Sequence, residues 1–218
     1  MTKDQIRKRI EEIGIIPAIR VSTAEDALFA AEAVCHSGIP IVEVTMTVPG
    51  ALDVISELVR FSSELVVGAG TLSGVEMANR CLDAGAMFLT SPGLDLEIVE
   101  FALKKKVVVF PGAMTPSEIM AAWKAGADFV KVFPCAPLGG PAYIKALKRP
   151  FPTVPLIASG GVNQQTAADF IEAGAVAVGI GRDLIQPAAI ERREGGWIRE
   201  LSRRYLEMVG DARRQKAA

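Results

Sequence analysis

The stretch PLIASGGVNQQTAADFIEAGAVAVGIG, residues 155–181, holds two short apolar runs separated by a glycine break and an alanine-rich segment. The alanine-rich segment has a helical composition and ends at Gly174, as helices commonly do. Short strands rich in Val and Ile that alternate with helices are typical of a parallel sheet covered by helices. The stretch therefore predicts a strand–helix–strand unit.

The same unit recurs along the chain, and successive apolar runs end roughly 20 to 26 residues apart, the length of one strand and one helix with short loops. Helix N-caps are predicted at Thr23, Ser73 and Thr115, because each has an acidic residue three positions on. Glycines that end helices are predicted at Gly38, Gly85 and Gly126 as well as Gly174. The apolar runs are IIPAIR (15–20), IVEVT (41–45), LVVGAGT (65–71), MFLTS (87–91), VVVF (107–110), FVKVF (129–133), PLIAS (155–159) and VAVGI (176–180).

Eight such units predict an α/β fold, a (β/α)8 barrel that forms a single domain over residues 1–218, with an extra N-terminal helix at residues 3–13. The alternative is an open doubly wound sheet, which usually binds a nucleotide through a glycine-rich turn after its first strand. The residues after the first strand here, from Arg20 to Thr23, include no glycine, which favours the barrel. The basic region from Arg203 to Lys216 predicts a frayed helix, with a basic tail from about residue 209 to 218; an interaction tail is the alternative.

The overall composition bears on the kinds of partner. The chain is 50% hydrophobic with a formal net charge of −1, so we expect no nucleic-acid partner and no membrane partner. Residues 1–12 alternate in charge, unlike a secretory signal, and no apolar run approaches the length of a membrane-spanning helix. The expected location is therefore the cytoplasm.

Cysteine and histidine are scarce. Cys35, Cys81 and Cys135 share no zinc-ligand spacing and are expected to be free thiols in a reducing compartment. The only histidine is His36, which excludes a histidine-rich metal centre. We expect no metal and no other cofactor.

Side chains alternate along a strand, so each strand of a barrel has an inward set and a set that faces the helices. The branched residues Val130 and Val132 suit the helix-facing side, which places Lys131 in the bore. The predicted inward sets are Ile16, Ala18 and Arg20; Ile41, Glu43 and Thr45; Val67, Ala69 and Thr71; and Phe129, Lys131 and Phe133.

Lys131 and Glu43 on core strands are unusual, because burying a charge without a partner is costly. One interpretation is a buried ion pair, which is a weak device for stability. The other is catalytic: a lysine kept partly neutral by apolar neighbours is nucleophilic near pH 7, and a nearby carboxylate moves protons. The barrel context favours the catalytic interpretation.

Two glycine-rich loops follow the seventh and eighth strands, Ser159-Gly160-Gly161-Val162 and Gly179-Ile180-Gly181-Arg182. In barrels these two loops commonly hold a phosphate with backbone N–H groups. Arg182 could add a bidentate contact. The alternative is that the glycines serve turn geometry alone, but their occurrence at both of these strands favours a phosphate site.

Seven segments in this order make the chain resemble a known family, the 2-keto-3-deoxy-6-phosphogluconate (KDPG) aldolases, which include 4-hydroxy-2-oxoglutarate (KHG) aldolases and a phosphogalactonate branch. The resemblance runs from about Ile15 to Leu184. The segments are GIPIVEVTMTVPGAL around Glu43, VGAGT ending at Thr71, SPG from Ser91, FPGAMTP from Phe110, VKVFP around Lys131, GPAYIKAL from Gly140 and SGGVN from Ser159.

The resemblance implies class I aldolase chemistry in which Lys131 forms a carbinolamine and then an imine with a 2-oxo acid. Glu43 would be the general acid/base, and the protonated imine would be the electron sink, so the implied chemistry needs no metal. The family is typically trimeric, which implies a homotrimer. The remaining implied roles are the substrate carboxylate for Thr71, the substrate pocket for Thr45, Pro92, Phe133 and Ser159, and the distal phosphate for Gly160, Gly161, Gly179, Gly181 and Arg182.

The chain departs from the best-known members at two places. Thr47 stands where those members have an arginine that binds the substrate carboxylate, and we expect Arg20 to take over that role. Ser159 and Arg182 stand where threonine and a small residue are common, which leaves open whether the distal group is a phosphate or a carboxylate. The open alternatives are a 2-dehydro-3-deoxy-6-phosphogalactonate aldolase, a phosphate-binding barrel isomerase or epimerase, and a barrel that binds sugar phosphates without turnover.

Overall fold

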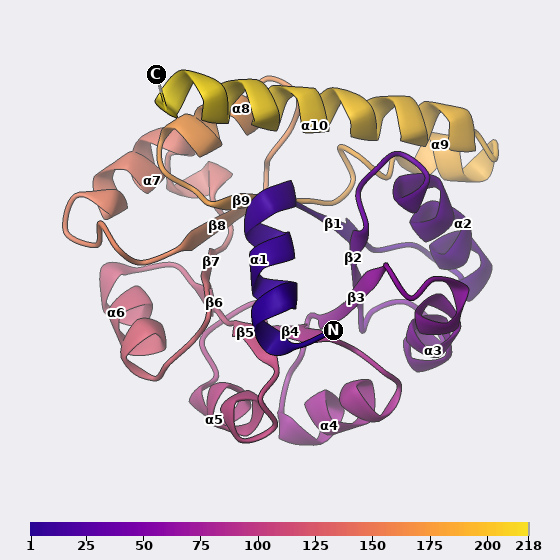
Figure 1. Cartoon of the computed structure of the whole chain (residues 1–218), viewed down its shortest axis with the longest axis horizontal. Coiled ribbons are helices and arrows are strands. Elements are labelled where there is room, and N and C mark those ends of the chain that lie inside the picture. Colours follow the sequence, from indigo (N-terminus) through magenta and orange to yellow (C-terminus); the bar gives the residue numbers. More distant parts are fainter. Residues whose placement is uncertain (218) are drawn as a thin grey trace.

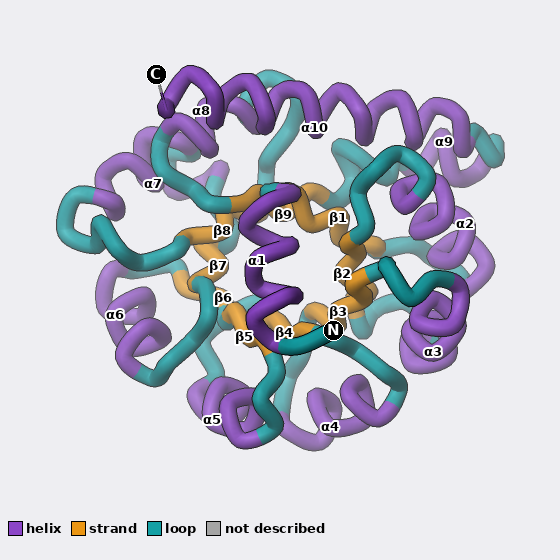
Figure 2. Tube along the Cα trace, viewed as in Figure 1, coloured by secondary structure: helices purple, strands orange, loops and turns teal. Residues whose placement is uncertain are grey.

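The computed structural model describes residues 1–217 of the chain and shows a ring of parallel strands surrounded by helices (Figures 1 and 2). The strand order is β5-β4-β3-β2-β1-β9-β8-β7-β6. The strands are β1 Ile15–Ile19, β2 Ile41–Thr45, β3 Val66–Gly70, β4 Phe88–Thr90, β5 Val108–Phe110, β6 Gly112–Ala113, β7 Val130–Val132, β8 Leu156–Ser159 and β9 Ala177–Ile180.

The fifth unit contains two strand segments: β5 lies within the predicted strand that ends at Phe110, and β6 follows beyond it, so eight units give nine strand segments. Strands β5 and β6 are separated only by Pro111, which has no N–H to donate to the sheet. Strand β5 pairs with β4 on one side, and β6 pairs with β7 on the other. The ring is therefore continuous through these two segments, and the predicted (β/α)8 barrel is confirmed.

The helices lie outside the ring, apart from α1, which crosses one end of it (Figure 1). Among the described residues none of them is long and apolar enough to cross a membrane. Their bounds, with the 3-10 turn η1, are α1 Lys3–Ile13, α2 Ala24–Cys35, α3 Ala51–Phe61, α4 Val75–Asp83, α5 Leu96–Lys104, α6 Pro116–Lys124, η1 Ala136–Leu138, α7 Pro141–Lys148, α8 Ala167–Glu172, α9 Pro187–Glu191 and α10 Gly195–Ala217.

Helix α1 closes the end of the barrel at which the strands begin, and its predicted range is confirmed. Thr2 and Gln5 form a capping box at its start, and Ile6 and Ile10 are buried. The Arg7 guanidinium lies 5.8 Å from the ring centroid of Phe129, inside the bore. A chain of aromatic rings fills this end of the bore, formed by Phe88, Phe110 and Phe129. Substrate access is left to the opposite end.

Most of the predicted helix boundaries are confirmed. Thr23 and Thr115 cap α2 and α6, and the helix-ending glycines have left-handed backbones. The prediction for Ser73 is wrong, because α4 begins at Val75 with Gly74 as its N-cap and without a side-chain cap bond.

At the end of the chain the predicted helix is present, but the structure differs in the expected tail. The segment expected to be a frayed basic tail from about residue 209 continues α10, with Val209 and Ala212 buried. Arg213 donates hydrogen bonds to the backbone carbonyls of Glu11 and Glu12 at the end of α1, and to that of Val176. The basic side chain thus satisfies carbonyls that the end of a helix leaves free. The last residue of the predicted tail, Ala218, lies outside the described residues.

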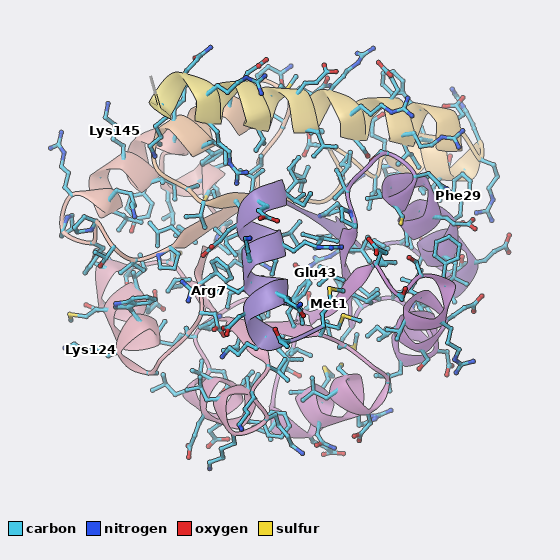
Figure 3. The ribbon with its side chains drawn as sticks, in the orientation of Figure 1. Met1, Arg7, Phe29, Glu43, Lys124 and Lys145 are labelled. Carbon is cyan, nitrogen blue, oxygen red and sulfur yellow. The ribbon has the colours of Figure 1, made fainter. Side chains whose placement is uncertain are left out.

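Strand register decides which side chains enter the bore. Residues paired across parallel strands face the same side, and the register aligns Ala18 with Glu43 and Glu43 with Gly68. On the other side of the ring, Lys131 aligns with Gly112 and Ile157. Figure 3 shows Glu43 within the ring of strands, whereas Lys124 and Lys145 lie on the outer helices.

Candidate active site

A cavity of about 280 Å³ opens at the end of the barrel where the strands finish. In (β/α)8 enzymes this is the face that carries the active site. Of the predicted site residues, the ones that line this cavity are Arg20, Glu43, Thr71, Pro92, Lys131, Phe133, Ser159, Gly160, Gly161, Gly179, Gly181 and Arg182.

Lys131 and Glu43 meet across the bore. The Nζ atom of Lys131 lies 3.5 Å from Oε2 of Glu43, and the two side chains are only 10% and 4% exposed. The same Nζ lies 5.7 Å from the ring centroid of Phe133, which covers it on one side. Within the described chain, the Glu43 carboxylate has no other ionic or hydrogen-bonding partner. The amine and the carboxylate therefore form a buried couple in which a proton could pass from one to the other.

Thr71 reaches the cavity by a route that alternation did not predict. A Cβ built on Gly70 would overlap the Glu43 carboxylate, and one built on Gly68 would overlap the ring of Phe88. The inward set of β3 is therefore Gly68 and Gly70, and the prediction of Val67 and Ala69 as inward is wrong. Thr71 follows the strand with φ of 61°, a rare conformation for a β-branched residue, and its side chain lines the cavity.

Arg20 and Thr71 form one corner of the cavity. Nη2 of Arg20 donates a hydrogen bond of 3.3 Å to the Thr71 hydroxyl, across the end of β2. The Arg20 side chain is exposed, so its remaining N–H groups are available to a ligand. A guanidinium beside a hydroxyl is a suitable site for a carboxylate.

Thr45 does not line the cavity, so the structure gives no support to its predicted place in the substrate pocket. Its hydroxyl donates to the backbone carbonyl of Ile19 over 3.0 Å and shares a 2.8 Å hydrogen bond with the Thr47 hydroxyl. The side chain is fully buried. Thr45 therefore joins the ends of β1 and β2. Its inward position on the strand, which is all that the sequence indicates, is compatible with this structural role as well as with substrate binding.

The two glycine loops lie side by side at the rim. Gly160 and Gly161 have φ of 86° and 91°, and a Cβ on Gly161 would overlap that of Ala136. Within the described chain, the backbone N–H groups of Gly161, Val162 and Arg182 donate to no protein acceptor. These free donors and the exposed Arg182 side chain form a concave surface suited to an anion.

Cys135 is a further candidate nucleophile, two residues after Phe133 in the chain. Its thiol is buried and donates to the carbonyl of Val132 over 3.0 Å. Burial raises the pKa of Cys135 to about 11. A thiol in this state is inert near neutral pH, so Cys135 is not expected to react with a ligand.

The cavity also contains residues that were not predicted as site residues. Ala18 was expected to face inward, but it was not assigned to the site because its methyl group carries no chemistry. Val162 and Asp183 line the rim beside the glycine loops. In the sequence, only the position of Val162 and Asp183 in or beside those loops could have indicated that they line the cavity. Among the described residues, no group of three His, Cys, Asp or Glu side chains is arranged to hold a metal ion.

The fold and the site together define a class: a (β/α)8-barrel enzyme with a lysine and a glutamate paired in the bore. The family model for KDPG and KHG aldolase matches residues 6–201. A 2-dehydro-3-deoxy-phosphogluconate aldolase of Pseudomonas aeruginosa is 32% identical over 203 residues, which cover 93% of this chain and 92% of the relative. The chain belongs to the KDPG and KHG aldolase family and is an aldolase, a carbon–carbon lyase.

The chain is also similar in structure to solved aldolase structures. A KDPG aldolase from Legionella pneumophila, with pyruvate captured as a covalent carbinolamine intermediate, is 30% identical. It superposes with a TM-score of 0.82, covering 90% of this chain and 96% of that one. A cube-shaped protein cage, designed by fusing symmetric oligomeric domains, is 28% identical with a TM-score of 0.85, covering 94% of this chain and 75% of that one.

Proposed function

We propose that this aldolase cleaves 2-keto-3-deoxy-6-phosphogluconate to pyruvate and glyceraldehyde 3-phosphate, or 4-hydroxy-2-oxoglutarate to pyruvate and glyoxylate, through a Schiff base on Lys131. The observation that carries the proposal is the 3.5 Å contact between Lys131 and Glu43 inside the cavity at the strand ends. The covalent carbinolamine with pyruvate captured in the Legionella relative supports a Schiff-base mechanism here.

In the proposed mechanism, Lys131 passes a proton to Glu43, and the free amine attacks the C2 ketone carbon of the substrate. Glu43 then protonates the leaving hydroxyl of the carbinolamine, which departs as water and leaves a protonated imine. When Glu43 removes the proton of the C4 hydroxyl, the C3–C4 bond breaks and its electron pair moves toward the imine nitrogen. The aldehyde leaves, C3 of the enamine is protonated, and water releases pyruvate from Lys131.

The proposed position of the 2-oxo acid carboxylate is the corner formed by Arg20 and Thr71. Their hydrogen bond holds a guanidinium and a hydroxyl together at the rim of the cavity. Thr47, which stands where the best-known members have an arginine, hydrogen-bonds to Thr45 instead. Arg20 is therefore the cation proposed to grip the carboxylate.

Replacing Arg20 with alanine is expected to weaken pyruvate binding by about 10- to 100-fold, because a charge-assisted hydrogen bond is lost. The measurement is the rate of reductive trapping as a function of pyruvate concentration. The double variant Arg20→Ala with Thr47→Arg should recover part of the affinity, since it supplies a cation from the turn that follows β2. Unchanged affinity in Arg20→Ala would make Arg20 a structural residue.

The proposed distal-phosphate site consists of the two glycine loops, Ser159 and Arg182. The free N–H groups of Gly161, Val162 and Arg182 support it, as does the proximity of Ser159 to Gly179, whose Cβ would lie 2.7 Å from the Ser159 hydroxyl. Pro92 and Phe133 are proposed to shape the middle of the pocket. Both line the cavity.

Replacing Arg182 with alanine is expected to lower kcat/KM for phosphorylated substrates by about 10- to 100-fold, because a bidentate contact to phosphate is removed. The value for 4-hydroxy-2-oxoglutarate should change less than about threefold. Arg192→Ala is the matched control, since Arg192 is an exposed arginine on the far end of α9 and does not line the cavity. An equal loss on both substrates would contradict a phosphate role for Arg182.

A second candidate substrate is the C4 epimer, 2-dehydro-3-deoxy-6-phosphogalactonate. Arg20 at the carboxylate corner, with threonine at position 47, resembles the arrangement used by other branches of the family. Comparing kcat/KM for the two epimers and for 4-hydroxy-2-oxoglutarate decides among these substrates.

We further propose that the chain acts as a homotrimer in the cytoplasm and as a single domain. The designed cage similar to this chain is built from symmetric oligomeric domains, which supports self-association. A native mass three times the 23.2 kDa of one chain is expected in solution, and a monomer mass would contradict the trimer. Cys35, Cys81 and Cys135 are all free, as expected in a reducing compartment, and cell fractionation tests that location.

Incubation with pyruvate and borohydride tests the proposed function directly. Borohydride reduces the imine to a stable secondary amine, so the expected result is an irreversible mass gain on a peptide that contains Lys131. Absence of an adduct, or an adduct confined to exposed lysines such as Lys145, would overturn the Schiff-base proposal.

A further inference from the structure

Glu43 reaches Lys131 without the hydrogen bonds that usually hold a catalytic carboxylate in place. Its side chain is 4% exposed, and Lys131 at 3.5 Å is its one ionic partner among the described residues. A buried carboxylate normally accepts hydrogen bonds from neighbouring donors. Apart from this contact with Lys131, the position of the carboxylate is set by the shape of the space around it.

That space is provided by the neighbouring strand. Register aligns Thr45 of β2 with Gly70 of β3, so the missing side chain of Gly70 leaves a recess on the bore side, just beyond Glu43. A Cβ at Gly70 would overlap the carboxylate of Glu43 and lie 2.7 Å from its Cγ. The Glu43 side chain thus occupies the volume that any other residue at position 70 would fill.

We propose that Gly70 is a positioning residue for the aldol reaction: its missing side chain provides the recess in which the Glu43 carboxylate lies within reach of Lys131. The proposal rests on the proposed function, because it assigns Gly70 the task of placing the general acid/base.

Glycine is needed at position 70 because a side chain there would collide with Glu43, and not because the backbone conformation excludes other residues. Gly70 does not have the left-handed backbone found at Thr71, its neighbour, so alanine can adopt the conformation of Gly70. The cost of Gly70→Ala should then come from the collision with Glu43. Shortening Glu43 removes that collision, which makes the two positions testable as a pair.

A double-mutant cycle with Gly70→Ala and Glu43→Ala tests the proposal. Gly70→Ala alone should lower kcat by about 100-fold, the effect of losing a general acid/base, and should lower the melting temperature. In the Glu43→Ala background the same substitution should change kcat less than about threefold and should leave the melting temperature of that background unchanged. Effects of Gly70→Ala that are the same in both backgrounds would overturn the proposal, as would wild-type activity in Gly70→Ala.

Two controls on the same strand separate a local collision from general damage. Gly68→Ala collides with Phe88 instead of Glu43, so its loss of stability should be the same with or without the Glu43 side chain. Ala69→Gly changes the helix-facing side and should retain activity within about threefold. Wild-type enzyme that is not trapped by pyruvate and borohydride would refute the proposed function itself. Trapping in the wild type together with additive effects in the cycle would refute only the role of Gly70.

Discussion

Replacing Lys131 with methionine is expected to abolish aldol cleavage. The expected loss in kcat is at least about 10⁴-fold, as is typical when a covalent nucleophile is removed. Methionine has a similar length and is unbranched, so it can occupy the same place in the bore beside Phe133. Within residues 1–217, which the structure describes, no other lysine lines the cavity, so none is placed to replace the amine. The measurements are steady-state turnover and the mass of the protein after treatment with pyruvate and borohydride.

The stability of this variant must be separated from its chemistry. Lys131→Met leaves Glu43 buried without its ionic partner, and breaking a buried pair in this way typically costs about 3–5 kcal/mol. The double variant Lys131→Met with Glu43→Gln removes both charges and should recover part of that stability while remaining inactive. Turnover near the wild-type level in the folded Lys131→Met protein would show that Lys131 and Glu43 form an ion pair with a structural role only.

Replacing Glu43 with glutamine is expected to slow every step that moves a proton, by about 10²-fold or more. Glutamine preserves the shape that fits the recess at Gly70 but can neither take a proton from the amine nor return one. Lys131 should still form an adduct with pyruvate in the presence of borohydride, although slowly. Exchange of the pyruvate C3 protons for deuterium, followed by NMR, measures the proton transfer separately from cleavage.

The two variants give different patterns, which makes the assignment of roles testable. Lys131→Met should show neither turnover nor an adduct, whereas Glu43→Gln should show an adduct with slow turnover. Proton exchange at the wild-type rate in Glu43→Gln would assign the proton transfers to water or to another group. Loss of the adduct in Glu43→Gln would instead make the carboxylate essential for activating the amine.

Much of the barrel and the catalytic couple could be predicted because their signals are local. Strands at regular spacing and capped helices follow from the nearest residues in the chain, and the bounds of β2 and α1 agree with the predicted ones. The placement of Lys131 and Glu43 in the bore followed from alternation, which holds inside a regular strand. Parallel strands in a closed ring then bring the two residues together.

Predictions failed where the signal was not local. Strand β3 contains only Val, Gly and Ala, so either phase of alternation suits its composition, and Thr71 was predicted to share the inward phase with Val67 and Ala69. Thr71 lies beyond the strand with a left-handed backbone, so its direction gives no information about the residues before it. The tail prediction failed for a similar reason: the carbonyls that Arg213 satisfies come from a helix about 200 positions earlier in the chain.

The sequence by itself determined the alternation of strands and helices, the barrel, and the pairing of an amine with a carboxylate in its bore. These follow from periodicity, from cap and turn residues, and from the cost of burying a charge. Only the tertiary structure decided that Thr45 joins two strands, that Thr71 turns toward Arg20, and that Gly70 makes room for Glu43. Each of these depends on contacts between neighbouring strands, and strand register is set by the packing of the whole ring.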